Sequence, residues 1–327
     1  MLMAAAAVLV GLAVLIWSSE RFIEGAVGTA HHLRLPAFII GTVIVGIGTS
    51  APEFLVSGLA AWQGQPGLAI GNAYGSNIAN IGLILGITLL LSPMAVGAGI
   101  VRREMSLLIV VTLMSRWLVG DGAISRLDAL LLVLPLIGYI AFVAFEARRN
   151  PAQATAMAPT PDDTPSDVPP FGRSLVWLAV GLVLLLASSR LLVWGASTIA
   201  AALGVSDLVI GLTVVAIGTS LPELASSISA VRRRAYDLVL GNVVGSNLFN
   251  TLGVVGVAGL ITPIDVEPSV LSRDWPIMLG LTLLLLVFAM RFGRRPAHLN
   301  RIEGGVFLLA FIAYTGWLVF GAFKAAV

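Results

Sequence analysis

The chain alternates between long apolar segments and short polar connections along almost its whole length. Ten apolar segments can be traced, at residues 2–30, 36–62, 67–92, 104–119, 126–147, 172–202, 206–231, 237–262, 274–292 and 302–323. A transmembrane helix needs about 20 apolar residues, so ten spans occupy most of the 327 residues. The pattern predicts an all-α polytopic membrane protein with ten transmembrane helices.

The composition supports membrane insertion and excludes several other classes. Hydrophobic residues make up 58% of the chain and charged residues only 11%, whereas soluble domains carry about 25% charged residues. The absence of cysteine excludes disulfides and thiolate metal sites. The net charge of +2 comes from loop arginines and does not indicate nucleic-acid binding. The lipid bilayer is the partner that this composition requires, and no obligate protein partner is evident.

The connections are short except for residues 148–171, which are rich in Pro, Ala and Thr and predict a flexible cytoplasmic linker. The first segment lacks a basic region before it, so it is expected to be a retained span rather than a cleaved signal. Cytoplasmic loops are enriched in basic residues, and alternate loops of this chain carry most of them. Ten spans then place both termini outside the cytoplasm, in the cell (inner) membrane. The basic residues of these loops are Arg34, Arg102, Arg103, Arg148, Arg149, Arg173, Arg232, Arg233, Arg234, Arg291, Arg294, Arg295 and Arg301.

The sequence contains an internal repeat at a constant offset. Residues 40–86 align with 210–256 without a gap, and 19 of the 47 positions are identical. Hydrophobicity alone would preserve leucine and valine, but not polar residues at fixed offsets, so we infer a duplication. We expect a first five-helix repeat at 1–147 and a second at 172–327. Because five is odd, the repeats must be inverted, which is a recurring plan of secondary transporters.

Each repeat places a carboxylate, two hydroxyls and a proline inside an apolar run, at Gly48–Glu53 and at Gly218–Glu223. An ionisable residue in hydrocarbon costs at least ~2.5–3.5 kcal/mol and is by default a functional-site candidate. The helical rise places each glutamate roughly 17 Å from the next turn, near the middle of the membrane. The two motifs are therefore expected to converge at one depth.

The neighbouring residues add oxygen donors on the same helix faces. Thr49 lies one turn before Glu53, and Asn72, Ser76 and Asn80 form a stripe at four-residue spacing. Prolines Pro52 and Pro222 free backbone carbonyls one turn earlier, in the second and seventh helices. The second, third, seventh and eighth helices are all expected to be broken. Hard oxygen donors suit Ca²⁺ or Na⁺. As an alternative, each Ser or Asn taken alone could form a hydrogen bond that holds two helices together.

Charged residues elsewhere are expected to have structural rather than ion-binding roles. Glu20, Arg21 and Glu24 in the first span are expected to pair locally or to reach the membrane surface. Arg190 stands at the repeat position of Glu20, so this cluster is not duplicated. Arg232–Arg234 is interpreted as a topology signal.

The two motifs resemble the α-repeats of the sodium/calcium exchanger (calcium:cation antiporter) superfamily, in its prokaryotic type without a regulatory cytosolic domain. The shared pattern is G-T-S-x-P-E followed by G-N-x-x-G-S-N-x-x-N, at 48–53 with 71–80 and at 218–223 with 241–250. The resemblance implies that the first and sixth spans slide across the other eight. It also implies a set of cation ligands, which are Glu53, Glu223, Thr49, Ser50, Ser76, Asn80, Thr219, Ser220, Ser246, Asn250 and the backbone carbonyls around Gly46 and Ala216. Some members have aspartate at the position of Asn250, and the asparagine here disfavours K⁺ dependence.

The resemblance implies a Na⁺/Ca²⁺ antiporter that exports Ca²⁺ by alternating access. Two glutamates can neutralise one Ca²⁺ or two to three Na⁺, but not both sets together, so competition enforces exchange. A proton/calcium antiporter on the same scaffold is the alternative, and a passive cation channel is a further one. No nucleophile–base constellation or nucleotide motif is present, so the chain is not expected to be an enzyme. No resident cofactor is expected, only transported Ca²⁺ and Na⁺, or H⁺ in the alternative.

Overall fold

The structure is a computed structural model, and it describes residues 1–33, 39–64, 66–97, 100–149, 169–203, 216–290 and 297–326. Most of the predicted linker, the start of the seventh predicted span, Arg34, Arg291, Arg294 and Arg295 lie outside these residues. Almost all described residues are helical, as the apolar pattern predicts.

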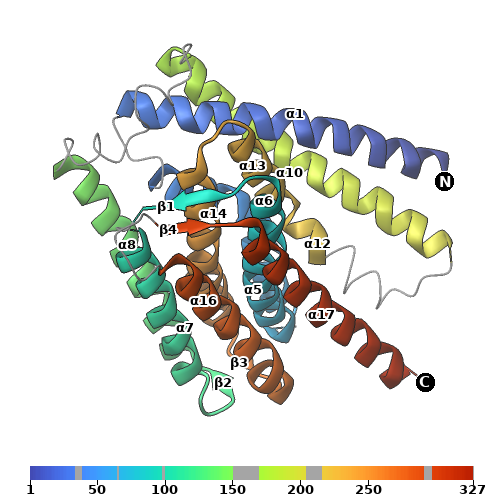
Figure 1. The fold of residues 1–327 in the computed structure, drawn as a ribbon. Helices are drawn as coiled ribbons and strands as arrows, with labels where there is room; N and C mark the ends of the chain where they lie inside the picture. Colours follow the sequence, from blue (N-terminus) through green and yellow to red (C-terminus); the bar gives the residue numbers. More distant parts are fainter. Residues whose placement is uncertain are drawn as a thin grey trace.

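Two long helices lie side by side across the rest of the molecule (Figure 1). They are α1 (Leu2–Leu33) and α10 (Phe171–Ala202), each 32 residues long. Glycines let the two backbones approach closely: a Cβ atom at Gly11 would lie 3.1 Å from the Leu192 amide nitrogen. Gly181 approaches Phe22 in the same way, and the internal repeat relates the two pairs to each other. Small residues at such contacts are typical of membrane helix packing.

The second and seventh predicted helices are interrupted at the motif serine. The second helix contains the π-helix η1 (Ile40–Val45), α3 (Gly46–Thr49) and α4 (Ala51–Trp62), and its two halves are bent by 46°. The described part of the seventh consists of α12 (Ala216–Thr219) and α13 (Leu221–Arg232). A proline near the start of α4 and of α13 lacks the amide that would continue the preceding helix. The predicted breaks are confirmed here.

The third and eighth helices run through the centre of the molecule and contain π-helical turns. The third helix consists of α5 (Pro66–Ala79), η2 (Asn80–Leu85) and α6 (Gly86–Leu91). The eighth helix consists of α14 (Tyr236–Leu248), η5 (Phe249–Val254) and α15 (Val255–Ile261). π-Helical turns are rare and are frequently found at functional sites. In both repeats the π-helix contains the last asparagine of the motif, Asn80 or Asn250.

The remaining helices form the outer layer of each repeat. They are η3 (Ile100–Met105), α7 (Ser106–Leu118) and α8 (Arg126–Arg149), with η6 (Val270–Asp274), α16 (Trp275–Ala289) and α17 (Arg301–Ala326) as counterparts. Among the described residues, seven helices are long and apolar enough to span a membrane, and the bent second helix makes eight. The fourth and the incompletely described seventh predicted spans are not among them, so the count of ten stays a prediction.

Two short antiparallel sheets connect the repeats, which the all-helical pattern did not predict. Strand β1 (Met94–Val96) pairs with β4 (Ala297–Leu299), and β2 (Ala123–Ile124) pairs with β3 (Ile264–Asp265). β1 and β3 each follow the third helix of a repeat, and the sheets lie toward opposite ends of the molecule (Figure 1). This arrangement is what two inverted repeats produce.

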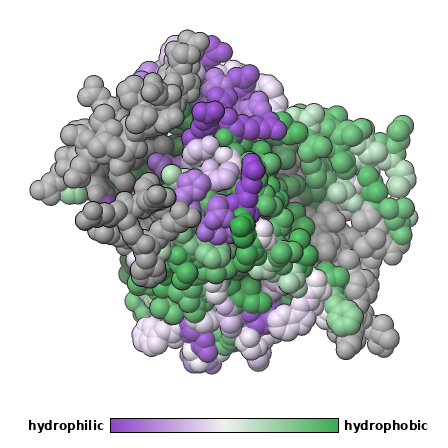
Figure 2. All heavy atoms as spheres, in the orientation of Figure 1, coloured by the Kyte–Doolittle hydropathy of each residue, from purple (hydrophilic) through white to green (hydrophobic). Residues whose placement is uncertain are grey.

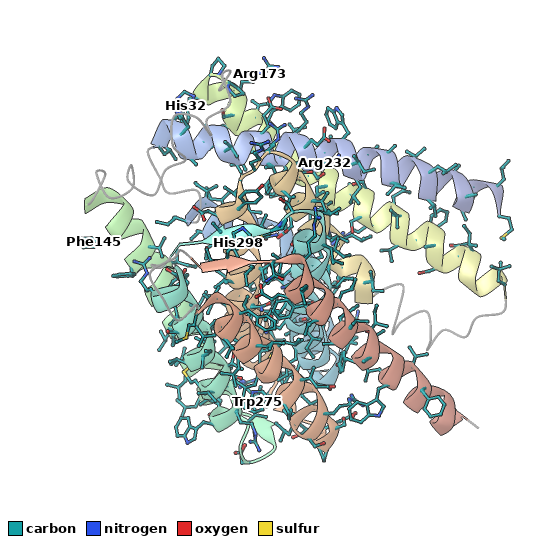
Figure 3. All side chains as sticks on the ribbon, in the orientation of Figure 1. His32, Phe145, Arg173, Arg232, Trp275 and His298 are labelled. Carbon is teal, nitrogen blue, oxygen red and sulfur yellow. The ribbon has the colours of Figure 1, made fainter. Side chains whose placement is uncertain are left out.

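The surface has the banding of a membrane protein. Figure 2 shows apolar side chains in a broad band, with hydrophilic ones gathered above and below it. Arg173 and Arg232 lie toward one end, whereas Trp275 lies toward the opposite end (Figure 3).

Candidate functional site

The two motif glutamates occupy equivalent positions in the first turns of α4 and α13. Both side chains lie inside the protein, with exposed fractions of 1% for Glu53 and 2% for Glu223. Each follows a helix break, so the unpaired amides of a helix N-terminus are close to the carboxylate, and such a position favours negative charge. The sequence thus predicts correctly that both carboxylates are buried at helix breaks.

Hydrogen bonds between the repeats join the two motifs. The Ser50 hydroxyl of the first repeat donates to Glu223 Oε1 of the second at 3.2 Å. The Thr49 hydroxyl donates to Asn242 Oδ1, also at 3.2 Å. Within the first repeat, Ser76 donates to Glu53 Oε1 at 3.4 Å. Two of these three bonds cross between the repeats, so the two motifs lie against each other inside the protein.

An asparagine on the following helix holds each motif helix in the same way. The Asn72 amide donates to the Glu53 carbonyl at 3.4 Å and to the Ser57 hydroxyl at 3.0 Å. Asn242 makes the same two bonds, to the Glu223 carbonyl at 3.4 Å and the Ser227 hydroxyl at 3.0 Å. Asn72 was recognised in the sequence as part of a polar stripe, and Asn242 is its repeat equivalent, but the positioning role of both was missed. The repeat of Ser57 at Ser227 was the available signal.

Several buried oxygens of the cluster have no hydrogen-bond partner. A buried polar atom without a partner is rare and calls for an explanation such as a missing ion or water. Among the predicted ligands, the unpaired atoms are carboxylate, amide and hydroxyl oxygens, and each has a lone pair that can bind a cation. They are Glu53 Oε2, Glu223 Oε2, Asn80 Oδ1, Asn250 Oδ1 and Ser220 Oγ. This donor set fits a hard cation such as Ca²⁺ or Na⁺.

The two motif asparagines differ in their contacts. The Asn80 amide donates to Asn247 Oδ1 at 2.9 Å, which connects the two repeats. Neither side-chain polar atom of Asn250 has a partner, although its side chain is buried. Asn247 and its repeat equivalent Asn77 were not selected as site residues from the sequence. Asn77 instead donates to Thr251 Oγ1 at 2.8 Å and leaves its own oxygen unpaired.

Two other predicted ligands, Ser246 and Gly46, lie close to each other. Ser246 is buried and donates to Asn242 Oδ1 at 3.4 Å, and its amide lies 3.3 Å from where a Cβ at Gly46 would be. Ala216 and Thr219 are the first and last residues of α12.

One of the backbone carbonyls that the motif prolines release makes a hydrogen bond to another helix. The Gly218 carbonyl, which Pro222 releases from helical bonding, accepts a hydrogen bond from Ser189 of α10 at 2.9 Å. This carbonyl therefore joins α12 to α10.

The described residues contain no basic partner for the central carboxylates. None of the ion pairs found among them involves Glu53 or Glu223. They also contain no group of three or more His, Cys, Asp or Glu side chains that could hold a metal ion. A cation at this site would thus rely on two carboxylates together with hydroxyl, amide and backbone oxygens.

A second duplicated polar group lies outside the site and was missed in the sequence. In the first repeat, the Glu104 carboxylate pairs with Arg103 at 2.8 Å and accepts a hydrogen bond from the Tyr139 hydroxyl at 2.8 Å. The second repeat contains the same arrangement at Arg273, Asp274 and Tyr314. The charged residues are again related by the offset of the internal repeat. From the sequence, Arg103 was interpreted as a loop charge, because periodicity does not show that the neighbouring carboxylate contacts a tyrosine of another helix.

Known proteins match the chain over nearly its whole length. The profile of the family described as "Sodium/calcium exchanger protein" matches residues 3–145 and 173–320. The "Putative antiporter CaxA" of Alkalimonas amylolytica is 44% identical over 96% of this chain and 98% of that protein. The "Sodium/calcium exchanger MaX1" of Methanosarcina acetivorans is 31% identical over 94% of this chain and 95% of that protein. The "Inner membrane protein YrbG" of Escherichia coli is 36% identical, with 97% of each chain covered.

The fold matches as well as the sequence. A solved structure of the sodium-calcium exchanger NCX_Mj, soaked with 2.5 mM Na⁺ and 0.1 mM Ca²⁺, has a TM-score of 0.81 and 32% identity, covering 96% of this chain and 97% of that one. The family and the fold are those of transporters rather than enzymes. The chain therefore belongs to the sodium/calcium exchanger family of membrane cation antiporters.

Proposed function

We propose that this protein exchanges Na⁺ for Ca²⁺ by alternating access and uses the Na⁺ gradient to export Ca²⁺. One observation carries the proposal: Glu53 and Glu223, one from each repeat, each have an unpaired oxygen in the same buried cluster. The names of the relatives MaX1 and NCX_Mj support these two ions.

Coupling follows from the charge of the centre. Two carboxylates neutralise one Ca²⁺ or two to three Na⁺, with the surrounding hydroxyl and amide oxygens replacing lost hydration water. Without a cation, two desolvated carboxylates repel each other, and this repulsion opposes an occluded empty state. The transporter then changes its access only when loaded, so one ion moves in exchange for the other.

The remaining ligands would complete a site between the repeats. Thr49, Ser50 and Ser76 form one side of it, and Thr219, Ser220 and Ser246 form the other, while Asn80 and Asn250 lie at the π-helical turns. Backbone carbonyls around Gly46 and Ala216 would add further oxygens. We also propose that both termini lie outside the cytoplasm, because the arginine-rich loops would then face it.

Replacing either central carboxylate tests this assignment. Glu53→Gln and Glu223→Gln each keep the shape of the side chain but remove half of the formal charge. We expect each variant to lose Na⁺-driven ⁴⁵Ca²⁺ uptake into proteoliposomes. Glu303→Gln is the matched control, because Glu303 accepts a bond from the Asn300 amide at the start of α17, and it should retain uptake. Uptake that persists in either central variant would contradict the two-carboxylate scheme.

The coupling ion is tested by the gradient that drives uptake. The purified protein is reconstituted, and ⁴⁵Ca²⁺ uptake is measured under an outward Na⁺, K⁺ or H⁺ gradient of equal size. Uptake with the Na⁺ gradient alone is expected. Uptake with a pH gradient in the absence of Na⁺ would establish proton/calcium antiport instead. Flux that continues without any counter-ion would indicate a passive channel.

A further inference from the structure

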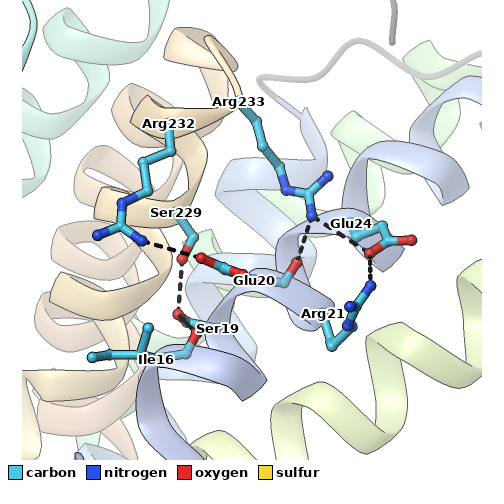
Figure 4. Close-up of polar contacts among 8 residues, drawn as sticks. All are labelled: Ile16, Ser19, Glu20, Arg21, Glu24, Ser229, Arg232 and Arg233. Carbon is cyan, nitrogen blue, oxygen red and sulfur yellow. Dashed lines mark hydrogen bonds and ion pairs between the residues drawn. The ribbon is translucent and has the colours of Figure 1, made fainter. Parts of the chain in front are cut away.

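The contact between α1 and α13 is polar, although both helices lie among apolar segments (Figure 4). The Ser19 and Ser229 hydroxyls lie 2.8 Å apart and are both buried. Closer to the surface, Arg232 forms an ion pair with Glu20 at 3.1 Å. The two helices are far apart in sequence, so these bonds fix the position of α1 on α13.

The next arginine strengthens the same contact. Arg233 donates to the Glu20 carbonyl at 3.3 Å and pairs with Glu24 at 3.4 Å (Figure 4). Glu24 also pairs with Arg21 of its own helix, as the sequence predicts, but the bonds to α13 were not predicted. We call these contacts of Ser19, Glu20 and Glu24 with Ser229, Arg232 and Arg233 the latch.

Within the described part of the chain, the latch exists in only one of the two repeats. Two inverted repeats would place an equivalent contact between α10 and α4, at the repeat positions of the latch residues. Of the six positions, only Ser19 has an identical partner, so neither ion pair can form on that side. The equivalent residues are Ser189, Arg190, Trp194, Leu59, Trp62 and Gln63.

The packing of the described residues differs between the two repeats in the same way as these sequences do. α1 packs along α13, and Ser229 is only 3% exposed. Its repeat equivalent on α4, Leu59, is 57% exposed, and α10 makes no comparable contact with α4. Ser189 bonds to α12 instead. The structure therefore has one closed seam, at the end that carries Arg232, and no closed counterpart among its described helices.

Hydroxyls connect this closed seam with the cation site. The Ser226 hydroxyl donates to the Glu223 carbonyl at 3.0 Å and accepts a bond from Asn242 at 3.3 Å. Ser229 lies one turn further along α13, on the way to Arg232. The corresponding positions of α4 are Val56 and Leu59. The polar seam of α13 is thus better suited to a passing cation, once α1 moves away, than the same positions of α4.

We propose that the α1–α13 seam is the ion route at the Arg232-bearing end, and that the latch is its gate. Because the opposite seam has no such contact among the described helices, the latch biases the transporter toward the state that is closed at this end. This inference rests on the alternating access proposed above. Opening the route requires both ion pairs to break, so Glu20 and Glu24 set the population of the two states without binding the transported ion.

The test measures access to single cysteines, since the natural chain contains none. Ser229→Cys and Leu59→Cys are introduced separately into the full chain, and labelling with a membrane-impermeant maleimide is measured from the two faces of proteoliposomes. Adding Glu20→Gln with Glu24→Gln should speed labelling of position 229 roughly two- to fivefold per lost ion pair. It should slow labelling of position 59 from the opposite face, because the two states are mutually exclusive. Adding Glu303→Gln should change neither rate.

Opposite changes in the labelling rates of positions 229 and 59 distinguish a gate from a general loss of stability, which would speed labelling at both. Faster labelling at both positions, or no change at position 229, would overturn the gate. The charge swap Glu20→Arg with Arg232→Glu should return both rates toward those of the parent cysteine variants, and a failure to do so would also count against it.

A cross-link tests the same seam without the charged residues. The double variant Ser19→Cys with Ser229→Cys is oxidised to a disulfide and then reduced. Oxidation should stop ⁴⁵Ca²⁺/Ca²⁺ exchange and reduction should restore it, and full exchange in the cross-linked protein would overturn the proposal. Neither labelling nor this exchange needs Na⁺. If labelling becomes faster at position 229 and slower at position 59 but uptake does not need Na⁺, only Na⁺ coupling is refuted. If uptake needs Na⁺ but the labelling rates do not change in this way, only the gate is refuted.

Discussion

Each central carboxylate uses one oxygen for a hydroxyl and leaves the other unpaired. Ser76 holds Glu53 and Ser50 holds Glu223, so one of the two hydroxyls comes from the opposite repeat. A buried charged group without a full set of partners is unfavourable, and the unpaired oxygens are available to a cation. The identity of these residues was predictable from the repeat, whereas their pairing was not.

The positioning asparagines provide a test at this scale. Asn72→Ala and Asn242→Ala each remove the side-chain amide that donates to a motif carbonyl and to a serine hydroxyl, and each lost hydrogen bond costs about 0.5–1.5 kcal/mol. We expect a roughly tenfold higher KM for Ca²⁺ in ⁴⁵Ca²⁺ uptake, because the glutamate loses its fixed position.

Two further variants check the reason. Asn72→Leu keeps approximately the size of the side chain and removes the donor without adding a charge, so it should behave like Asn72→Ala. Asn300→Ala removes the side-chain oxygen that accepts bonds at the start of α17, and should lower stability without changing KM. An unchanged KM in both asparagine-to-alanine site variants would refute the positioning role.

At the scale of elements, the proline-containing motifs interrupt the second and seventh helices as predicted. The third and eighth helices were also expected to be broken, but each continues through a π-helical turn. The most extensive contact joins α1 to α10. It depends on glycines that admit the opposite backbone, such as Gly181 against Phe22.

This packing predicts that alanine is not tolerated at Gly181. A Cβ atom there would lie 2.6 Å from the Phe22 nitrogen, and overpacking of this kind costs about 1–3 kcal/mol. Gly181→Ala should therefore lower the midpoint of thermal unfolding in detergent. Gly280→Ala is the control, because its Cβ would meet no atom within 4 Å and alanine favours a helix by about 1 kcal/mol. Equal midpoints for both variants would contradict the close approach.

At the scale of the whole molecule, the repeats exchange their last helices. α17 of the second repeat packs on α6 of the first, and α8 of the first packs on α15 of the second. The two sheets reinforce this exchange, because each pairs one strand from either repeat. We propose that the halves 1–147 and 172–327, although they arose by duplication, stabilise each other and form one body.

The duplicated tyrosines anchor the exchanged helices. Tyr139 and Tyr314 occupy the same position in their helices, counted from Arg126 at the start of α8 and from Arg301 at the start of α17. Each donates to the buried carboxylate of the preceding segment. Tyr139→Phe and Tyr314→Phe should each lower stability by about 1.5–3 kcal/mol, the contribution of a hydrogen bond to a charged group. Thermal unfolding in detergent measures it.

Tyr236→Phe supplies the comparison for these variants. The Tyr236 hydroxyl lies 3.1 Å from the neutral Ser92 hydroxyl, so its loss should cost only about 0.5–1.5 kcal/mol. A larger loss of stability in Tyr236→Phe than in both other variants would contradict the anchoring role.

The sequence by itself determined the membrane class, the duplication and the two buried motif glutamates, because these depend on composition and on identities at a fixed offset. The positions of the helix breaks were also determined locally, since proline removes a specific backbone donor. Tertiary structure alone decided which partner each polar group has. Glu20 was expected to pair within its helix or to reach the membrane surface, but it contacts Arg232 of α13, because the register between helices distant in sequence is set by packing and not by periodicity. The two glutamate motifs are nearly identical in sequence, but the residues around them differ, and the structure places α1 on α13 in a polar contact that has no equivalent between the described residues of α10 and α4.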